Sequence, residues 1–418
     1  MLINMAKAAK AAARNLALLD ENQKNAALGS IADRLVNNIP AVLDANGADV
    51  KEARAAEMPE HMIDRLILNE DRLLSIVNDL RKVTELEDPV GEIFDEYSPP
   101  NGLVIHKVRV PLGVIAVIYE SRPNVTLDVA GLALKTGNAV ILRGGSETIR
   151  TNRQLVRITQ AALKDSGLPS ASVQLIDSPD RKYVAELLKL HQWVDMLIPR
   201  GGAALHQYCR ENSTIPVITG GIGICHLFVD QSADLDGAVK VIFNAKVQRP
   251  SVCNALDTIL VHEAIAEEFL PSVIGNLAEA GVSFRVDESA GKLLKSFSNE
   301  LVQPAGPDDF DREWLSLVLG IKVVHNLDEA IDHITEHGTQ HSDGILTGDD
   351  GHAKYFINAV DSAAVYVNAS TRFTDGSQLG LGAEVAVSTQ RLHARGPMAL
   401  RELTTYKWVI QGNNHIRE

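Results

Sequence analysis

The sequence has few cysteines, few aromatic residues and no long apolar run, and each shortage excludes a class of protein. Its 418 residues include three cysteines, Cys209, Cys225 and Cys253, and aromatic residues make up 5%. An odd number of cysteines without CxxC spacing disfavours a disulfide framework or a structural zinc site, and it fits a reducing cytoplasm. No window reaches the ~18 apolar residues of a membrane span. The histidines show no metal-ligand spacing, so we expect no metal.

Positive charge is also scarce, because the formal net charge is -14. This balance disfavours binding to nucleic acid or to anionic membranes. Hydrophobic residues make up 45% and charged residues 22%, as in soluble globular proteins. The length predicts two or three domains. Lys7, Lys10 and Arg14 interrupt the Ala-rich start, which we interpret as an amphipathic helix and not as a cleaved signal.

The apolar pattern changes along the chain and predicts an α/β fold. Residues 1 to about 90 repeat apolar positions at helical spacing. From Val110, continuous β-branched runs alternate with helical stretches, and the series restarts near residue 230. Such alternation predicts two domains with parallel sheets and helices on both faces. The C-terminal run LTTYKWVIQG resembles a strand, which could pair with the isolated strand at 103–110 or with a neighbouring subunit.

Cys253 lies in a polar, proline-broken turn, RPSVCN, directly before an apolar run. A structural thiol more often lies within an apolar element, although a buried, inert thiol stays an open alternative. Lys246 and Arg249 are close in sequence, and nearby cations lower a thiol pKa. A thiolate attacks acyl carbonyls to give a thioester. We therefore predict that Cys253 is a nucleophile with two buried cysteines elsewhere, and that its turn lies at the carboxyl edge of a sheet.

Two glycine turns follow predicted strands and precede predicted helices. They are RGGSE at 143–147, with Gly144 and Gly145, and PRGG at 199–202, with Gly201 and Gly202. Glycines at such a place let backbone N–H groups approach a phosphate, and Arg143 and Arg200 favour a phosphorylated ligand. Neither turn matches GxGxxG or GxxxxGK[ST], so simple turn chemistry stays an alternative.

Several longer motifs resemble the aldehyde dehydrogenase superfamily. These are VPLGVIAVIYESRPNVTLDVAGLALKTGNAVILRGGSE and TGGIGICHLFVDQSADLDGAV, followed by the cysteine turn. The segments VVHNLDEAIDHITEHGTQHSDGI, NASTRFTDGSQLGLGAEVAVSTQRLHARGP and LTTYKWVIQG are similar to the branch of this superfamily that reduces γ-glutamyl phosphate. The resemblance covers essentially the whole chain.

The resemblance implies an aldehyde dehydrogenase-like α/β fold with two parallel-sheet domains and a small β oligomerisation element. Residues 1–97 and 113–230 would form an NADPH-binding domain, 231–396 the catalytic domain, and 98–112 and 397–418 the oligomerisation strands. It implies NADPH-dependent reduction of L-glutamyl 5-phosphate to L-glutamate 5-semialdehyde and phosphate, the second step of proline biosynthesis. We expect a stand-alone cytoplasmic homo-oligomer, a dimer or tetramer, with glutamate 5-kinase handing over the labile substrate.

The resemblance also implies roles for individual residues. The backbone N–H of Cys253 and the Asn124 side chain would stabilise the oxyanion, Glu313 would hold the nicotinamide ribose, and Gly220 and Gly221 would form the glycine loop of the cofactor site. Arg372 would anchor the substrate tail and Arg122 would face the phosphoryl group. A turn-forming Asn124 and a solvated Glu313 stay as alternatives. For His341, Asp343, His393 and Arg395, substrate binding and a role in the fold are both open.

Two departures from the wider superfamily bear on the chemistry. Hydrolytic members carry a glutamate before the glycine loop that activates water, whereas no glutamate occurs from 212 to 262 here. An acyl-phosphate reductase gains nothing from that base, because water would waste the thioester. NAD-using members have the motif Lys-Pro-x-Glu at this place. In this chain, Arg143 replaces the lysine and Ser146 replaces the glutamate. This exchange suits a 2′-phosphate, unless a shifted loop brings Glu147 into the same place.

Two other functions compete with this prediction. The nearest is a related reductase that takes an acyl-CoA or another acyl phosphate. The other is a catalytically silent binding protein on the same fold. The intact Cys253 beside a complete loop disfavours the second.

Overall fold

The computed structural model describes residues 1–220 and 222–417, and the chain divides into two compact units. Unit 1 comprises Met1–Thr219, Gly380–Ala386 and the segment from Met398 onward; unit 2 comprises Gly220–Leu379 and Val387–Pro397. The sequence predicted a boundary at residue 230. The structure places it earlier, because strand β7 (Cys225–Val229) pairs on both sides within the sheet of unit 2. The cofactor and catalytic roles of the two units stay predictions.

Helices form the first part of unit 1, as the apolar spacing predicted. They are α1 (Leu2–Leu16), α2 (Glu21–Val36), α3 (Ile39–Ala55), α4 (Glu60–Leu66) and α5 (Glu70–Glu85). A capping box begins α2: Gln23 N donates to the Asp20 carboxylate at 2.8 Å, and Asp20 N donates to the Gln23 side chain at 3.0 Å. These bonds satisfy helix donors that would otherwise lack partners. On the inner face, Leu28, Ile31 and Leu35 are buried, so packing holds the helix against the rest of unit 1.

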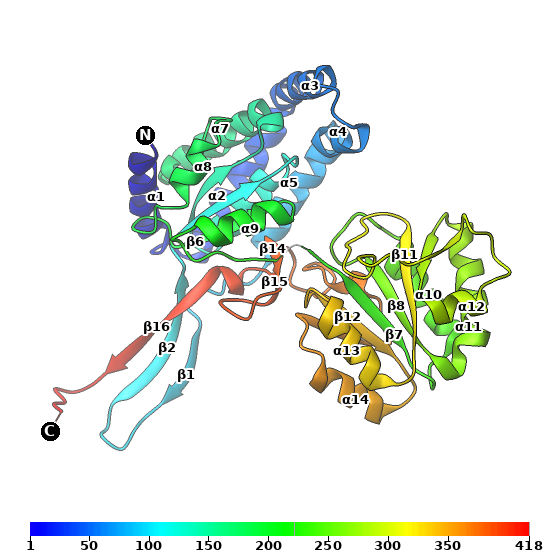
Figure 1. The fold of residues 1–418 in the computed structure, drawn as a ribbon. Helices are drawn as coiled ribbons and strands as arrows, with labels where there is room; N and C mark the ends of the chain where they lie inside the picture. Colours follow the sequence, from blue (N-terminus) through cyan, green and yellow to red (C-terminus); the bar gives the residue numbers. More distant parts are fainter. Residues whose placement is uncertain (221, 418) are drawn as a thin grey trace. The chain divides into compact units, whose positions relative to one another are not determined.

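A four-stranded parallel sheet forms the centre of unit 1, in the order β5-β4-β3-β6 (Figure 1). Its strands are β3 (Val114–Tyr119), β4 (Ala139–Arg143), β5 (Val173–Leu175) and β6 (Met196–Arg200), and its helices are α6 (Val125–Lys135), α7 (Ile149–Asp165), α8 (Lys182–Leu187) and α9 (Ala203–Asn212). The continuous β-branched runs predicted these buried strands. The predicted strand at 215–221 is wrong over its described residues, where Val217 makes an isolated bridge to Leu197. Pro216 has no N–H for a ladder there.

Unit 2 contains a seven-stranded parallel sheet, in the order β10-β9-β11-β8-β7-β12-β13. Besides β7, its strands are β8 (Leu256–His262), β9 (Ser283–Val286), β10 (Val302–Pro304), β11 (Val318–Val324), β12 (Ser342–Leu346) and β13 (Ala364–Val367). Its helices are α10 (Leu235–Val247), α11 (Glu263–Glu279), α12 (Glu288–Leu293), α13 (Leu327–His337) and α14 (Asp350–Ala359). The predicted α/β class, with two parallel sheets, is confirmed.

The cysteine turn lies at the amino edge of this sheet, and the predicted carboxyl edge is wrong. Helix α10 follows β7 and returns the chain to the edge where parallel strands begin. The turn then leads into β8 at Leu256. A loop that connects a helix to a parallel strand always lies at the amino edge, whereas strand-to-helix loops lie at the carboxyl edge.

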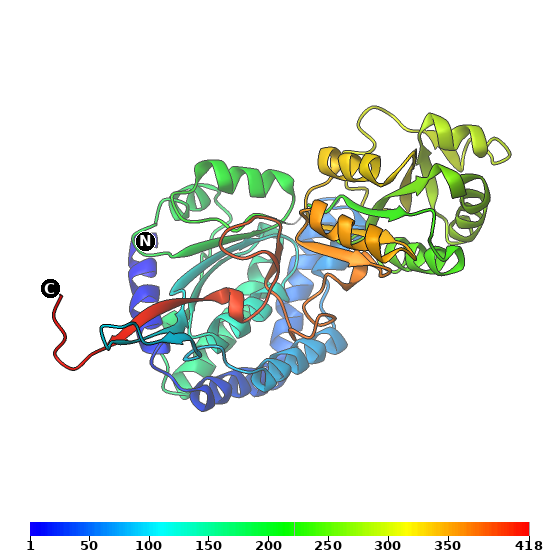
Figure 2. The same cartoon turned by 90° about the horizontal axis from the view of Figure 1, so that it is seen from below.

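A small antiparallel sheet completes unit 1, in the order β1-β2-β16. Its strands are β1 (Ile93–Tyr97), β2 (Val104–Pro111) and β16 (Thr404–Gln411). Of the two alternatives for the C-terminal strand, the structure shows the pairing with the strand at 103–110. The sequence did not predict β1. Figure 1 and Figure 2 show β2 and β16 running together beyond the helices of unit 1. Tyr406, Trp408 and Ile410 are 47%, 51% and 60% exposed.

The remaining elements are short. They are β14 (Ala386–Ser388) and β15 (Gly396–Met398), which pair with each other, and the 3-10 helices η1 (Ser146–Thr148), η2 (Ser170–Ser172), η3 (Thr371–Phe373) and η4 (Arg401–Leu403). Among the described residues, no helix is long and apolar enough to cross a membrane.

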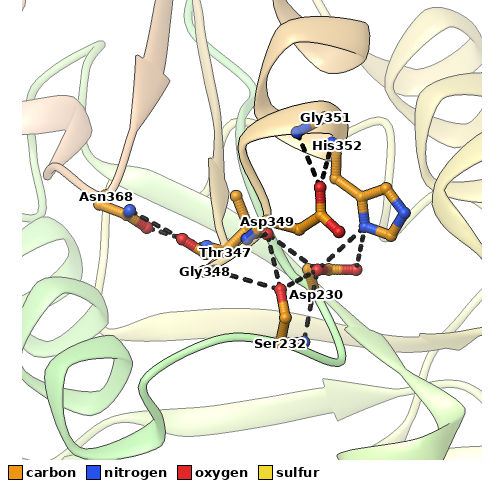
Figure 3. Close-up of polar contacts among 8 residues, drawn as sticks. All are labelled: Asp230, Ser232, Thr347, Gly348, Asp349, Gly351, His352 and Asn368. Atoms are coloured by element: carbon orange, nitrogen blue, oxygen red, sulfur yellow. Dashed lines mark hydrogen bonds and ion pairs between the residues drawn. The ribbon is translucent and has the colours of Figure 1, made fainter.

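A polar network ties together the carboxyl edge of the unit 2 sheet (Figure 3). The buried Asp230 carboxylate, after β7, accepts from Ser232 Oγ at 2.5 Å, from Thr347 Oγ1 at 2.8 Å and from His352 Nδ1 at 3.1 Å. The Asp349 carboxylate caps α14 by accepting from the backbone N–H groups of Gly351 and His352. These bonds join β7, β12 and α14. A buried carboxylate stabilises the fold while its hydrogen-bond donors are in place, and the loss of one donor lowers the free energy of unfolding.

Removing His352 is expected to lower stability in a pH-dependent way. The hydrogen bond that His352 donates to Asp230 raises the pKa of His352. Burial opposes ionisation of Asp230, but the hydrogen bonds that its carboxylate accepts outweigh burial and lower its pKa. The ion pair therefore stabilises the fold below the ordinary histidine pKa of about 6.5 and is lost as pH rises through the raised folded value. We expect His352→Gln to lower the melting temperature more at about pH 6 than at about pH 9. An equal loss at both values would contradict this assignment.

Candidate active site

Cys253 lies in a tight turn that two neighbouring segments hold in place. The turn closes through a bond from Ala255 N to Val252 O at 3.0 Å. Cys225 Sγ donates to the Cys253 carbonyl oxygen at 3.2 Å. Gly223 packs so closely that a Cβ built on it would lie 1.6 Å from that same oxygen. The glycine loop before β7 and the cysteine turn before β8 are therefore in direct contact.

The three cysteines differ in exposure, as the sequence predicted. Cys209 and Cys225 are buried, and Cys253 is half-buried. Burial raises the pKa of Cys209 to about 11 and raises that of Cys225 well above its ordinary value. Both buried thiols therefore stay protonated and inert at neutral pH. The role of Cys253 as nucleophile stays a prediction.

Lys246, which the sequence suggested as a cation near the thiol, is buried in unit 2. Its side chain is fully buried, and its Nζ donates to Leu256 O at 2.8 Å and lies 3.7 Å from Asp257 Oδ1. Burial lowers the pKa of Lys246 to about 8 and raises that of Asp257 to about 6. Asp257 Oδ1 also accepts from Trp314 N at 3.0 Å. The pair links the last turn of α10, the start of β8 and the segment that carries Glu313.

Glu313 contacts the glycine loop and is not a solvated loop charge. Its Oε1 accepts from Gly223 N at 3.0 Å. Burial raises its pKa to about 7, the Gly223 hydrogen bond opposes this shift, and Asp257 adds to it. Gly223 therefore contacts both the Glu313 carboxylate and the carbonyl oxygen of Cys253. Gly220 lies against Val387, since a Cβ there would be 2.2 Å from the Val387 carbonyl oxygen. Gly221 lies outside the described residues.

Arg372 lies beside the cysteine turn in the same unit. Its Nε donates to Gln248 Oε1 at 3.0 Å, and an Nη atom donates to Asn254 Oδ1. Asn254 Nδ2 in turn donates to Thr374 O at 3.0 Å. Burial lowers the pKa of Arg372, repulsion from Arg249 adds to this, and attraction to Cys253 opposes it.

Three of the unassigned residues contribute bonds within unit 2. Asp343, fully buried in β12, accepts from His226 N and from His226 Nδ1 at 2.9 Å each. Burial lowers the pKa of His341 to about 4, and its Nδ1 contacts Ser342 Oγ at 2.8 Å. Arg395 forms an ion pair with Asp361 at 2.6 Å. These contacts favour a role in the fold. His393 is exposed.

In unit 1, the first glycine turn follows β4 and is packed tightly. A Cβ on Gly144 would lie 2.2 Å from Asn152 Nδ2. Arg143 lies at the strand end, and its two Nη atoms donate to Gly144 O at 2.8 Å and to Pro179 O at 3.0 Å. Burial lowers the Arg143 pKa, and attraction to Glu147 opposes the shift. The guanidinium is thus held beside the turn.

The second glycine turn follows β6 and leads into α9. A Cβ on Gly201 would lie 2.6 Å from Glu120 Oε2, and Gly202 N donates to the same oxygen at 3.4 Å. Arg200 ends β6, and its charge, after burial, helps to lower the pKa of His206 to about 4. A carboxylate therefore lies where the N-terminus of α9 would receive an anion.

Asn124 and Arg122 lie in the turn between β3 and α6, in unit 1. Asn124 Nδ2 donates to Asp128 Oδ2 at 2.8 Å, and burial raises the pKa of Asp128 to about 6. Asn124 has helical backbone angles directly before α6, which fits the turn-forming alternative. Arg122 O accepts from Val125 N at 3.1 Å. Because Cys253 belongs to unit 2, the joint oxyanion site stays a prediction.

The predicted residues thus form two groups. Cys253, Glu313 and Arg372 come together in unit 2. Arg143 and Ser146 with their glycines lie at the end of β4, and Arg200 with its glycines lies at the end of β6, on the other side of β3. The sequence did not predict the parts played by Gly223 and Asp257. A third glycine in TGGIG and a lone acid inside the apolar run of β8 were the available signals.

The residues of unit 1 fit a dinucleotide. Strands β4 and β6 flank β3, so Arg143 and Arg200 end two strands on either side of β3. Gly144, Gly145 and Gly201 lie where a Cβ would clash with neighbouring side chains. Such strand ends, with a helix N-terminus beside them, receive the phosphates of dinucleotides.

Comparison with known proteins extends these observations. Residues 2–290 match the model of the aldehyde dehydrogenase family. The γ-glutamyl phosphate reductase of Salmonella newport is 58% identical over 417 residues, covering 100% of both chains. The crystal structure of that enzyme from Thermotoga maritima superposes with a TM-score of 0.97 at 47% identity, covering 100% of both chains. The Saccharomyces cerevisiae γ-glutamyl phosphate reductase is 30% identical, with a TM-score of 0.53, over 99% of this chain and 98% of its own.

Proposed function

Because the chain belongs to the aldehyde dehydrogenase family of nicotinamide-dependent oxidoreductases, we propose that it reduces L-glutamyl 5-phosphate with NADPH. The products are L-glutamate 5-semialdehyde and phosphate, the second step of proline biosynthesis. One observation carries the proposal: the half-buried Cys253 contacts Gly223, beside Glu313 and Arg372, in a stretch without a general-base glutamate. The named relatives support the choice of substrate.

The covalent step runs through the sulfur of Cys253. The thiolate attacks the acyl carbon, a C–S bond forms, and the C–O bond to phosphate breaks, so inorganic phosphate leaves with the electron pair. NADPH, when bound, supplies the hydride that reduces the thioester. Collapse of the resulting hemithioacetal releases the aldehyde and the thiol. The backbone N–H of Cys253 and the Asn124 amide are proposed to stabilise the oxyanion.

The surroundings of Cys253 suit an acyl phosphate better than hydrolysis. Phosphate leaves without a general acid, and no glutamate lies between 212 and 262 to activate water. Glu313 lies close to the cysteine turn through Gly223, and its carboxylate accepts from Gly223 N. We propose that it holds the nicotinamide ribose and leaves the thioester intact until hydride transfer.

Two cations are proposed to bind the anionic ends of the substrate. Arg372 is fixed by Gln248 and Asn254 next to Cys253, so it can anchor a carboxylate without reorganising. Arg122 is proposed to face the phosphoryl group. In unit 1, Arg143, Ser146 and the two glycine turns are proposed to hold NADPH, together with Gly220 and Gly221.

Strands β2 and β16 are proposed to join subunits in a homo-oligomer, a dimer or tetramer. Tyr406 and Trp408 expose large rings on one strand, and Lys107 Nζ lies 4.7 Å and 4.8 Å from their centroids. Exposed aromatic side chains on a paired strand are typical of an interface. We propose that glutamate 5-kinase hands over the substrate, because the acyl phosphate is labile. We propose a cytoplasmic location, because a reducing compartment keeps the thiol of Cys253 free.

The reverse reaction tests this function. We expect pyrroline-5-carboxylate and NADP⁺ to yield NADPH only when inorganic phosphate is present, because phosphate must cleave the thioester. Absorbance of NADPH measures the rate. Formation without phosphate would mean that water cleaves the thioester, against the interpretation of the missing glutamate. No NADPH with phosphate, but turnover of an acyl-CoA, would identify the related reductase, and bound NADPH without any turnover would identify a silent binding protein.

A further inference from the structure

Ser121 binds the carboxylate of Glu147 at the carboxyl edge of the unit 1 sheet. Ser121 lies two residues after β3 and has a φ of 46°, in the left-handed region that non-glycine residues seldom adopt. In this conformation its N–H donates to Glu147 Oε1 at 2.8 Å and its Oγ donates to the same oxygen at 2.9 Å. A strained residue that makes two bonds to one carboxylate oxygen points to a positioning role.

The held carboxylate lies over the first glycine turn. A Cβ on Gly145 would lie 2.1 Å and 2.4 Å from the two Glu147 carboxylate oxygens. Gly145 therefore has no room for a side chain while Glu147 keeps this position. Strands β3 and β4 are neighbours, so the carboxylate lies between their carboxyl ends. Ser146 Oγ is 3.4 Å from Glu147 Oε2.

Arg143 lies beside this carboxylate but directs its hydrogen bonds elsewhere. Its Nη atoms donate to the carbonyl oxygens of Gly144 and Pro179. Glu147 is the strongest attraction that opposes the effect of burial on the Arg143 pKa. A released Glu147 carboxylate would pair with Arg143 and cancel its charge. It would also repel a phosphate and accept a hydrogen bond from a free ribose hydroxyl.

We propose that Ser121 determines cofactor choice as a positioning residue, by keeping Glu147 out of a hydrogen bond with Arg143 so that the guanidinium can receive a ribose 2′-phosphate. The inference rests on the proposed use of NADPH. Releasing Glu147 would place its carboxylate against Arg143 and favour NADH.

Four variants separate the position of the carboxylate from its charge. Ser121→Ala and Glu147→Asp keep the charge but weaken the contact, by removing the Oγ donor or shortening the side chain. We expect each to weaken binding of 2′,5′-ADP relative to ADP by about tenfold, as for one lost charge-assisted hydrogen bond. Glu147→Gln and the double variant Ser121→Ala with Glu147→Gln carry no charge, and should bind 2′,5′-ADP at least as tightly as the wild type.

Calorimetric titration of the full chain with both nucleotides measures the ratio without turnover, and the ratio of kcat/KM for NADPH and NADH is expected to follow it. Ser172→Ala is the matched control, because it deletes a buried unit 1 hydroxyl that bonds no described side chain or backbone group. Unchanged ratios in Ser121→Ala and Glu147→Asp would overturn the proposal, as would weaker 2′,5′-ADP binding in Glu147→Gln. A wild type that binds ADP as tightly as 2′,5′-ADP would instead contradict the proposed use of NADPH, and the inference with it.

Discussion

Replacing Cys253 by alanine is expected to abolish the reduction. Without the sulfur, no thioester forms, and the rate should fall by roughly 10⁴-fold or more, as when other covalent nucleophiles are removed. The variant should fold, because Cys253 is half-buried and the contacts that hold its turn run through its carbonyl oxygen. Steady-state rates in both directions measure the loss. Nucleotide binding in unit 1 should be unchanged.

Alkylation of the intact protein provides the direct control. Iodoacetamide at neutral pH should modify the wild type once, at Cys253, since burial raises the pKa of Cys209 to about 11 and that of Cys225 well above its ordinary value. Mass spectrometry of the intact chain should show no modification in Cys253→Ala. Cys209→Ala, which changes a buried cysteine of unit 1, should keep the wild-type pattern. Substantial activity in Cys253→Ala would refute the thioester route.

The fold was predictable where the pattern was strong. The β-branched runs of β3, β4, β7 and β8 have few other interpretations. The pairing of β16 with β2 was one of two alternatives for a strand without a partner. The boundary between the units and the strand β1 were not predictable. Both depend on which strands pair, and pairing is a long-range property that periodicity does not contain.

The candidate site was predictable in its residue types but less so in its contacts. Motifs identified Cys253, Glu313 and Arg372, and the structure brings them together in unit 2. Lys246 illustrates the limit, because its place in the sequence suggested a cation acting on the thiol, whereas the side chain turns inward to Leu256 O and Asp257. The direction of a side chain on a helix depends on the neighbours that pack against it.

Gly223→Ala is expected to disable the enzyme without touching any reacting group. The new Cβ would lie 1.6 Å from the Cys253 carbonyl oxygen and 2.6 Å from its carbonyl carbon. Both atoms belong to the backbone, so the cysteine turn must shift, and the bond from Gly223 N to Glu313 must change with it. A displacement of about 1 Å at a nucleophile costs on the order of 10²-fold in rate. We expect kcat/KM to fall at least that far, and stability to fall by about 1–3 kcal/mol.

A matched glycine separates this clash from a general effect of adding a methyl group. Gly275 lies inside α11 of the same unit, and a Cβ there would meet nothing within 4 Å. Gly275→Ala should keep the wild-type rate and raise stability by about 0.5–1 kcal/mol, because alanine favours the helix. Rates, thermal melts and the speed of Cys253 alkylation compare the two variants. If Gly223→Ala retained the wild-type rate and alkylation speed, the contact with Gly223 would not determine the position of the Cys253 sulfur. The assignment of a positioning role to the glycine loop would then be wrong.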